Sequence, residues 1–437
     1  MTWAVTLIAA FGLILALFAS GLPIFACFLL ANIAGVLFIV GWSGLGLFVN
    51  SILDTATTES LVAIPLYVLL GELLFRTGGV GTLYSALNGL IGRVRGRLYV
   101  IAIVLSSFLG AISGSAMASV AMLGRFVYPT MIERGCNRRL TIGTILSGAT
   151  LDPIIPPSVL AIILATLANI SIGDFLVAGL VPGMVLAGCF AAYAIARTLL
   201  DPSLDARPEP EGAEGGGWQT ALASLLRILP ICIIIFLVLG LILLGIAQPT
   251  EAAAVGIVGT ALMSAATRTL SFEIIGRSCM GAATATATVL VILASAKLFS
   301  QLLAYTGATS GLVELISGLT LNRYIVLFVM MATVFFFCMF MDQLALMLIA
   351  VPVYGPIIAH LGFDPIWFWM LFLINITLGG ITPPFGYTMF VFKSVADEVP
   401  LTEIYRAAWP FVGIAIFAMV LLTLFPGLVT WLPGLRG

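Results

Sequence analysis

Charged side chains are too scarce in this sequence to cover a soluble protein of its length. Asp, Glu, Lys and Arg make up 8% of the 437 residues, whereas hydrophobic residues make up 61%. An ordinary soluble domain has roughly 25% charged residues, most of them on its surface. Lipid must therefore surround most of this chain. The sequence predicts an all-α polytopic membrane protein.

The same composition excludes several classes of function. A net charge of −1 without a dense basic run provides no surface for nucleic acid. One histidine, His360, and six scattered cysteines form no His/Cys metal site at any usual spacing. His-Glu-x-x-His and Walker-type phosphate loops do not occur. We therefore expect no enzyme and no organic cofactor, and any transport must draw on an ion gradient.

A repeat with an offset of 227 residues divides the chain into two halves. Pro156-Pro157 has its counterpart in Pro383-Pro384. Three further pairs share this offset: Ser115 and Asp342, Pro129 and Pro356, and Gly135 and Gly362. Such a series is typical of transporters built from internal repeats. We predict one repeat over residues 1–200, a second over 228–437, and a solvated cytoplasmic linker over 201–227.

Two arginine clusters predict a re-entrant hairpin in the first half. They consist of Arg93, Arg95 and Arg97, and of Arg134, Arg138 and Arg139. Both should face the cytoplasm, because positively charged loops are retained there. The segment 98–133 between them is too short for two full spans of about 20 residues each and a turn. We predict a hairpin whose tip, Ser113-Gly114-Ser115, lies near the middle of the membrane.

The second half has a matching hairpin over 324–358, with Asp342 at its tip. Few basic residues flank it, as expected at the outer face. Equivalent hairpins that enter from opposite sides imply inverted repeats, each with five spans, one of which is a broken helix. We place the broken helices at 141–168 and 367–393. The first apolar run, Trp3 to Phe18, should be a span and not a signal peptide, since no basic residue precedes it.

The two Pro-Pro pairs must open their helices, because proline lacks an N–H and clashes with the preceding turn. Carbonyls freed in this way cannot face lipid, and they could hold a cation while helix N-termini hold an anionic substrate. Hydroxyl groups and glycines suited to such sites flank the breaks and the first hairpin tip: Ser113, Ser115, Ser158, Thr382, Gly114, Gly379, Gly380 and Gly386. The alternative is that proline and small residues only kink and pack the helices.

Ionisable residues inside apolar runs are the other candidates, because a charge in lipid is costly. Asp342 could be a cation ligand or proton carrier, or a structural hydrogen-bond acceptor for its hairpin. Asp152 could cap a helix end or bind a ligand. Lys297 could be buried, or its ammonium could reach the membrane surface. Asp54 and Glu59 are expected in loops.

An ordered set of short motifs resembles a known family over essentially the whole chain. The motifs are Gly21-x-Pro23, Ser113-Gly-Ser-Ala116, Ile155-Pro-Pro-Ser158, Asp342 followed by Leu348-Ile-Ala-Val-Pro352, Gly362-Phe-Asp-Pro365 and Gly380-Ile-Thr-Pro-Pro384. Together they are similar to the large membrane subunit of tripartite ATP-independent periplasmic (TRAP) transporters, the DctM-like family. The resemblance implies an elevator-type fold of the ion transporter superfamily that couples sodium to the uptake of an organic acid.

The resemblance also implies sodium sites where a hairpin tip meets a broken helix. The first site would use Ser113, Gly114, Ser115, Pro153 and Pro156. The second would use Asp342, Gly379, Gly380 and Thr382. The substrate would lie among Ser113, Ser115, Ser158, Thr382, Pro383 and Pro384. The sequence departs from the family at Leu151-Asp152-Pro153, where relatives usually have apolar or small residues.

The family further implies two partners and a bacterial inner membrane. These are a small four-helix membrane subunit, expected as a separate chain, and a periplasmic substrate-binding protein. The cargo could be a C4-dicarboxylate, a sugar acid, a keto acid or a sialic acid. Two alternatives share the repeats and hairpins: an ion-coupled symporter that works without partners, and a passive channel.

The charge argument gives a topology prediction. Single-cysteine variants at Arg95 and at Arg138 should both resist a membrane-impermeant thiol reagent in intact cells, because both positions face the cytoplasm. Labelling at only one of the two positions would reveal a complete span between them and contradict the hairpin.

Overall fold

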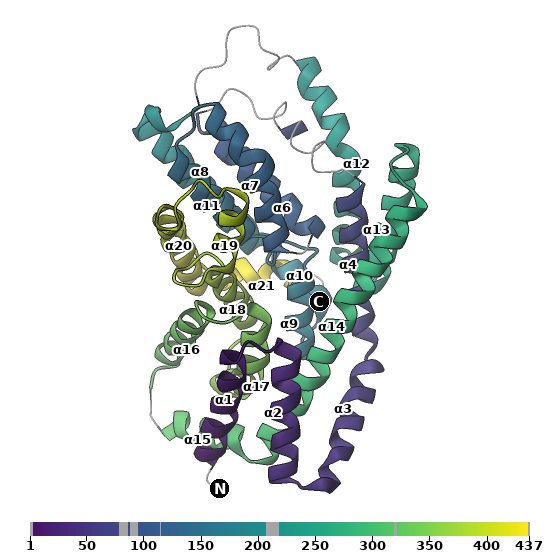
Figure 1. Ribbon diagram of the computed structural model, residues 1–437, viewed down its shortest axis with the longest axis vertical. Helices are drawn as coiled ribbons and strands as arrows, with labels where there is room; N and C mark the ends of the chain where they lie inside the picture. Colours follow the sequence, from purple (N-terminus) through teal and green to yellow (C-terminus); the bar gives the residue numbers. More distant parts are fainter. Residues whose placement is uncertain are drawn as a thin grey trace.

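The computed structural model describes residues 3–77, 86–87, 95–113, 115–206, 218–318 and 321–435, and within these ranges every regular element is a helix (Figure 1). Gly114 and residues 207–217 of the predicted linker lie outside the described residues. The predicted all-helical architecture is confirmed.

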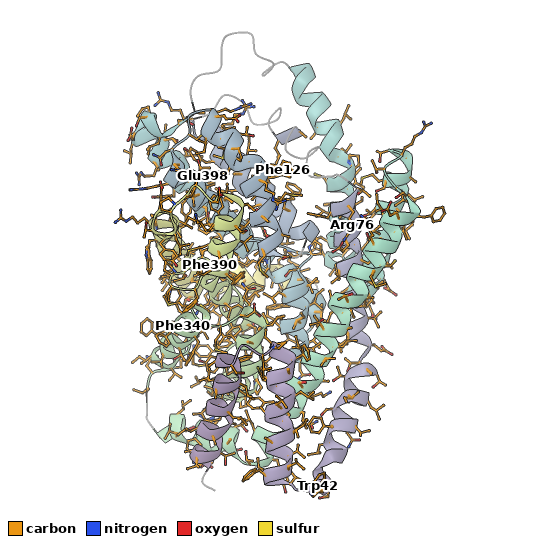
Figure 2. The ribbon with its side chains drawn as sticks, in the orientation of Figure 1. Trp42, Arg76, Phe126, Phe340, Phe390 and Glu398 are labelled. Carbon is orange, nitrogen blue, oxygen red and sulfur yellow. The ribbon has the colours of Figure 1, made fainter. Side chains whose placement is uncertain are left out.

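Large hydrophobic side chains project from the outer faces of the helices (Figure 2). Trp42 is 79% exposed and Phe126 is 67% exposed. In the described part of the chain, four helical stretches are long and apolar enough to cross a membrane: Ile172–Leu200, Phe272–Tyr305, Gln343–Leu361 and Leu401–Leu424. Shorter apolar helices accompany them. Because such faces are stable only in lipid, the chain is a multi-pass membrane protein.

One group of helices is built around the longest one. The first half provides α1 (Trp3–Ala19), α2 (Ile24–Ile39), α3 (Gly46–Ala56) and α4 (Ala63–Arg76), with short 3₁₀ turns η1 (Trp42–Leu45) and η2 (Glu59–Val62). The second half provides α12 (Trp218–Leu243), α13 (Pro249–Ala266), α14 (Phe272–Tyr305) and α15 (Ala308–Gly318). Helix α14 packs along α2, α3 and α4, as Figure 1 shows.

Helix α3 corrects the expectation that Asp54 lies in a loop. Asp54 is on α3, and its carboxylate pairs with Lys297 of α14. The Ser51 hydroxyl donates to Gln301 Oε1 at 3.1 Å in the same contact. Lys297 is thus neither buried nor isolated, because its side chain is 40% exposed and ion-paired. The sequence argument missed α3 because its apolar residues alternate with polar ones that pair across to α14.

Each half has a helical hairpin at the predicted place. Helices α6 (Arg97–Ser113) and α7 (Ala116–Glu133) form the first, and α16 (Arg323–Cys338) and α17 (Gln343–Leu361) form the second. Ser115 caps the N-terminus of α7, and Asp342 caps that of α17. Ser115 and Asp342, which share the 227-residue offset, therefore have the same role as N-caps at the two hairpin tips.

A broken helix follows each hairpin. The first consists of α8 (Arg138–Ala149) and α9 (Val159–Leu167), and the second of α18 (Pro365–Gly379) and α19 (Tyr387–Val395). The turn before each begins with a left-handed glycine, Gly135 (φ 84°) or Gly362 (φ 67°). Asn137 and Asp364 then cap α8 and α18. These matched stop and start signals explain why the offset is visible in the sequence.

The helices that follow complete the second group. They are α10 (Ile172–Ala178) and α11 (Leu180–Leu200) after the short α9, then η3 (Pro202–Leu204), and α20 (Leu401–Leu424) and α21 (Gly427–Gly434) after α19. Helix α19 packs against α7 of the other half, and α9 packs against α17 and α18. In the contact between α19 and α7, the ring centroids of Tyr128 and Phe392 are 5.2 Å apart. The second arm of each broken helix thus packs against the hairpin of the opposite half, whereas the first arm packs against the hairpin of its own half. The domain boundaries and the inversion of the repeats stay predictions.

Candidate functional site

The two breaks free backbone carbonyls inside the protein. Pro156 and Pro157 have no N–H, so the carbonyls of Asp152 and Pro153 lose their helical donors. The Ser158 hydroxyl donates to Pro153 O at 2.7 Å and also caps α9. In the second half, Gly380 is at the position equivalent to Pro153, and its carbonyl accepts the Thr388 hydroxyl and, at 3.2 Å, the Thr388 N–H. The Pro153 carbonyl thus has one lone pair in a hydrogen bond, whereas the Gly380 carbonyl accepts two hydrogen bonds from Thr388.

Two further hydrogen bonds fix the second break. The buried Thr382 hydroxyl donates to Leu378 O at 2.6 Å, and Tyr405 Oη donates to Pro384 O at 2.9 Å. Thr382 therefore uses its proton on its own helix and presents only oxygen lone pairs to a ligand. That donor pattern fits a cation better than an anion.

In the second half the hairpin and the break are in direct contact. A methyl group on Gly379 would lie 2.2 Å from Cys338 O, at the end of α16. Gln343 Nε2, just after the hairpin tip, donates to Ile376 O at 3.4 Å. Only glycine at position 379 permits this approach. The structure thus brings the Asp342 tip and the Gly379–Thr382 segment together, as the second predicted site requires.

The first half brings a different part of its hairpin to the break. Ser119, one turn into α7, lies beside Asp152. Ser115 is partly buried, and its hydroxyl accepts the Ala118 N–H at 3.4 Å. Ser113 is the last residue of α6, and Gly114 falls outside the described residues. The turn between α10 and α11 covers the other side, since a methyl group on Gly179 would lie 2.4 Å from Ile154 O.

The two carboxylates of the region have opposite environments. Asp152 is fully buried beside the Ser119 hydroxyl, and none of the ion pairs among the described residues includes it. Asp342 is accessible to solvent, and its Oδ2 accepts the Leu344 N–H at 2.9 Å. This bond fits the structural role that was the alternative for Asp342, and the backbone N–H groups of Gln343 and Ala345 also act on its carboxylate. Both carboxylates lie close enough to Tyr387 to act on it electrostatically.

The sequence analysis did not single out Tyr387 or Asn375. The Tyr387 ring packs against Gly380, where a methyl group would come within 2.9 Å of it. Asn375 Nδ2 donates to Met331 O at 2.7 Å and so ties α18 to α16, whereas its buried Oδ1 has no partner among the described residues. A lone amide in the apolar run Leu371–Leu378 was the available signal for Asn375. Tyr387 gave no signal, because its neighbours come from distant segments.

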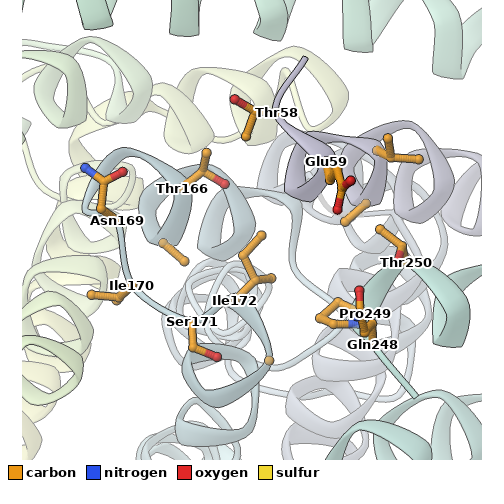
Figure 3. Close-up of a pocket in the computed structure, with 14 residues that line it drawn as sticks. Thr58, Glu59, Thr166, Asn169, Ile170, Ser171, Ile172, Gln248, Pro249 and Thr250 are labelled. Carbon is orange, nitrogen blue, oxygen red and sulfur yellow. The ribbon is translucent and has the colours of Figure 1, made fainter. Parts of the chain in front are cut away.

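A polar cavity of about 600 Å³ lies between the two groups of helices (Figure 3). Thr58 and Glu59 at η2 line one side, and the turn between α12 and α13, with Gln248, lines another. Asn169 and Ser171, in the turn between α9 and α10, close it. At this position the cavity separates the broken-helix group from the group built on α14.

Comparison with known proteins gives one consistent result. Residues 11–428 match the family described as "Tripartite ATP-independent periplasmic transporter, DctM component". The C4-dicarboxylate TRAP transporter large permease protein DctM of Pseudomonas aeruginosa is 30% identical over 388 residues, which cover 88% of each chain. The ectoine TRAP transporter large permease protein TeaC of Halomonas elongata is 26% identical over 95% of this chain and 96% of its own. These names describe transporter permeases and not enzymes.

A solved structure shares the fold. The Alcanivorax borkumensis YdaH transporter superposes with a TM-score of 0.63 over 91% of this chain and 90% of its own, at 14% identity. At that identity the likeness concerns the fold alone.

The hydroxyl on the freed carbonyl gives a stability prediction. Ser158→Ala removes both an N-cap and the donor to Pro153 O, and should cost about 2 kcal/mol. Ser171→Ala is the matched control, because Ser171 only caps α10 at an exposed site, and should cost about 1 kcal/mol or less. The thermal unfolding midpoints of the two variants in detergent measure the difference. Equal shifts would mean that the Pro153 carbonyl does not depend on Ser158.

Proposed function

The chain belongs to the DctM family and is the large membrane subunit of a tripartite ATP-independent periplasmic transporter, and we propose that it imports an organic acid anion. The energy for this uptake would come from a sodium gradient. The observation that carries the proposal is the pair of breaks. Each places freed carbonyls beside a hairpin and starts a new helix directly after them.

The start of a helix favours an anion. Helices α9 and α19 begin right after the Pro-Pro pairs, so their first N–H groups and positive dipole ends face the breaks. Ser113, Ser115, Ser158, Thr382, Pro383 and Pro384 are the residues we propose around the substrate. Two relatives are named for C4-dicarboxylates and ectoine, solutes that bear a carboxylate. C4-dicarboxylates, sugar acids, keto acids and sialic acids form the substrate class that we propose.

Sodium would occupy the carbonyl side of each break. Hard oxygen ligands suit an alkali cation, and carbonyl oxygens recur where a protein replaces the hydration shell of an ion. The first site would combine Ser113, Gly114, Ser115, Pro153 and Pro156. The second would combine Asp342, Gly379, Gly380 and Thr382, and the contacts of Gly379 and Gln343 support this grouping.

Movement of the broken-helix group relative to the α14 group would carry the site across the membrane. The polar cavity between η2, the α9–α10 turn and the α12–α13 turn supports a seam at which such elevator motion can occur. A small four-helix membrane subunit, as a separate chain, would support the α14 group in the bacterial inner membrane. A periplasmic binding protein would deliver the substrate.

Dependence on the binding protein tests the tripartite proposal. In proteoliposomes with the small subunit, uptake should be negligible until the binding protein is added, because selectivity and delivery rest with that protein. An imposed sodium gradient should then drive accumulation above the outside concentration. Robust uptake without the binding protein would favour the lone symporter, and equilibration without any gradient would favour the channel.

Sodium dependence tests the hairpin tips. Ser115→Ala removes a neutral oxygen, whereas Asp342→Asn keeps the shape and removes a charge. Both should raise the sodium concentration for half-maximal uptake, Asp342→Asn by about tenfold, because an anionic ligand contributes more to a dehydrated site. Insertion should stay normal, since each change lowers the cost of desolvation. Unchanged sodium dependence in both variants would remove the tips from coupling.

A further inference from the structure

The 227-residue offset, applied to the residues in contact, shows that each half has one carboxylate where its hairpin meets its broken helix. In the second half the carboxylate is at the hairpin tip, Asp342, and the break has Gly379. In the first half the equivalent tip residue is Ser115, and the break has Asp152. A carboxyl group is therefore present in both halves but is carried by opposite elements.

Sterics explain why the second half cannot have its charge at the break. Position 379 has no room for any side chain, because even a methyl group would lie 2.2 Å from Cys338 O. The first half does have room, since Asp152 is accommodated there with no exposed surface. Its side chain lies against α7, the arm of the hairpin that begins with Ser115, with Ser119 as its neighbour.

Asp152 also lacks the counter-ion that a buried carboxylate needs. Within the described residues its neighbour with a hydroxyl group is Ser119, and none of the ion pairs there includes Asp152. It does not cap a helix, since α9 is capped by Ser158. A buried carboxyl group without a counter-ion must either keep its proton or bind a cation, because a lone buried anion is unfavourable.

The backbone beside Asp152 can complete such a site. Its own carbonyl has lost its helical donor to Pro156, and the Pro153 carbonyl has one lone pair engaged by Ser158. The Ser119 hydroxyl supplies a further oxygen next to the carboxylate. These are hard oxygen ligands from two elements, as alkali cations require.

We propose that Asp152 is the anionic ligand of the first sodium site, so that both coupling sites of this transporter are charged. The inference deepens the proposed sodium coupling and rests on it. In the first sodium site the carboxylate would come from the broken helix, through Asp152, and the hairpin would add neutral oxygen ligands. In the second site the carboxylate would come from the hairpin tip, through Asp342, and the broken helix would add the neutral ligands.

The test measures sodium binding without transport. The purified complex with its small subunit is heated in increasing NaCl, with choline chloride keeping the ionic strength constant. Bound sodium raises the unfolding midpoint according to its affinity. Asp152→Asn, which keeps the shape, should shift the half-maximal sodium concentration upward by about tenfold, and Asp152→Gly should shift it further. Asp397→Asn, an exposed carboxylate in the turn after α19, should leave it unchanged.

A transplant adds a gain-of-function arm. Ser115→Asp in the Asp152→Gly background moves the carboxylate to the hairpin tip, as in the second half, and should restore sodium affinity toward the wild-type value. Unchanged sodium dependence in both Asp152 variants would overturn the inference while leaving sodium coupling intact. The inference would also be overturned if the Asp152 variants lost only the pH dependence of the unfolding midpoint and kept its sodium dependence, because Asp152 would then be a proton site. If sodium neither raised the unfolding midpoint of the wild-type complex nor drove uptake by it, the proposed sodium coupling itself would be refuted.

Discussion

Backbone carbonyls freed inside a membrane protein must find partners within it, and this constraint shapes the whole structure. Each Pro-Pro pair removes two helical donors at membrane depth, and lipid cannot replace them. The protein satisfies Pro153 O with Ser158 and Gly380 O with Thr388. It then encloses both breaks with the hairpins, α10 and α20. The breaks are thus stable only at the centre of a helical group, where other helices provide partners for the freed carbonyls. An ion and a substrate can also be shielded from water there.

The repeats are alike in their backbone and different in their side chains. Left-handed glycines and capping residues fall at matching positions, because a helix can end and restart in few ways. Chemistry is less constrained, and the carboxylate appears at Asp342 in one half and Asp152 in the other. A second difference lies in the α14 group, where α14 is continuous but its counterpart is divided into α3 and α4 near η2. That division lets η2 line the polar cavity with Thr58 and Glu59.

Local signals made much of this fold predictable from the sequence. Arginine clusters, glycines and Pro-Pro pairs act on adjacent residues, so they are signals from which helix ends and breaks can be predicted. The grouping of Asp342 with Gly379 followed from the repeat and the family resemblance. What could not be predicted depends on distant contacts: the pairing of Asp54 with Lys297, the packing of α19 on α7, and the electrostatic influence of two carboxylates from different halves on Tyr387. The burial of Asp152 belongs with these, because a sequence does not show which helix will cover a polar side chain.

The geometry of a broken helix also supplies a reason for coupling. The C-terminal end of α8 or α18 presents carbonyls, and the N-terminal end of α9 or α19 presents N–H groups, across a break of only a few residues. A cation at the first end and an anion at the second would attract each other strongly at that separation in a medium of low dielectric. With Asp152 and Asp342 both charged, the empty group of helices carries two negative charges, and a carboxylate substrate would be repelled from it. On the proposed function, bound sodium would cancel that repulsion, so the substrate would bind well only after the ions. The freed carbonyls that require enclosure would then also be the reason that the ion and the substrate move together.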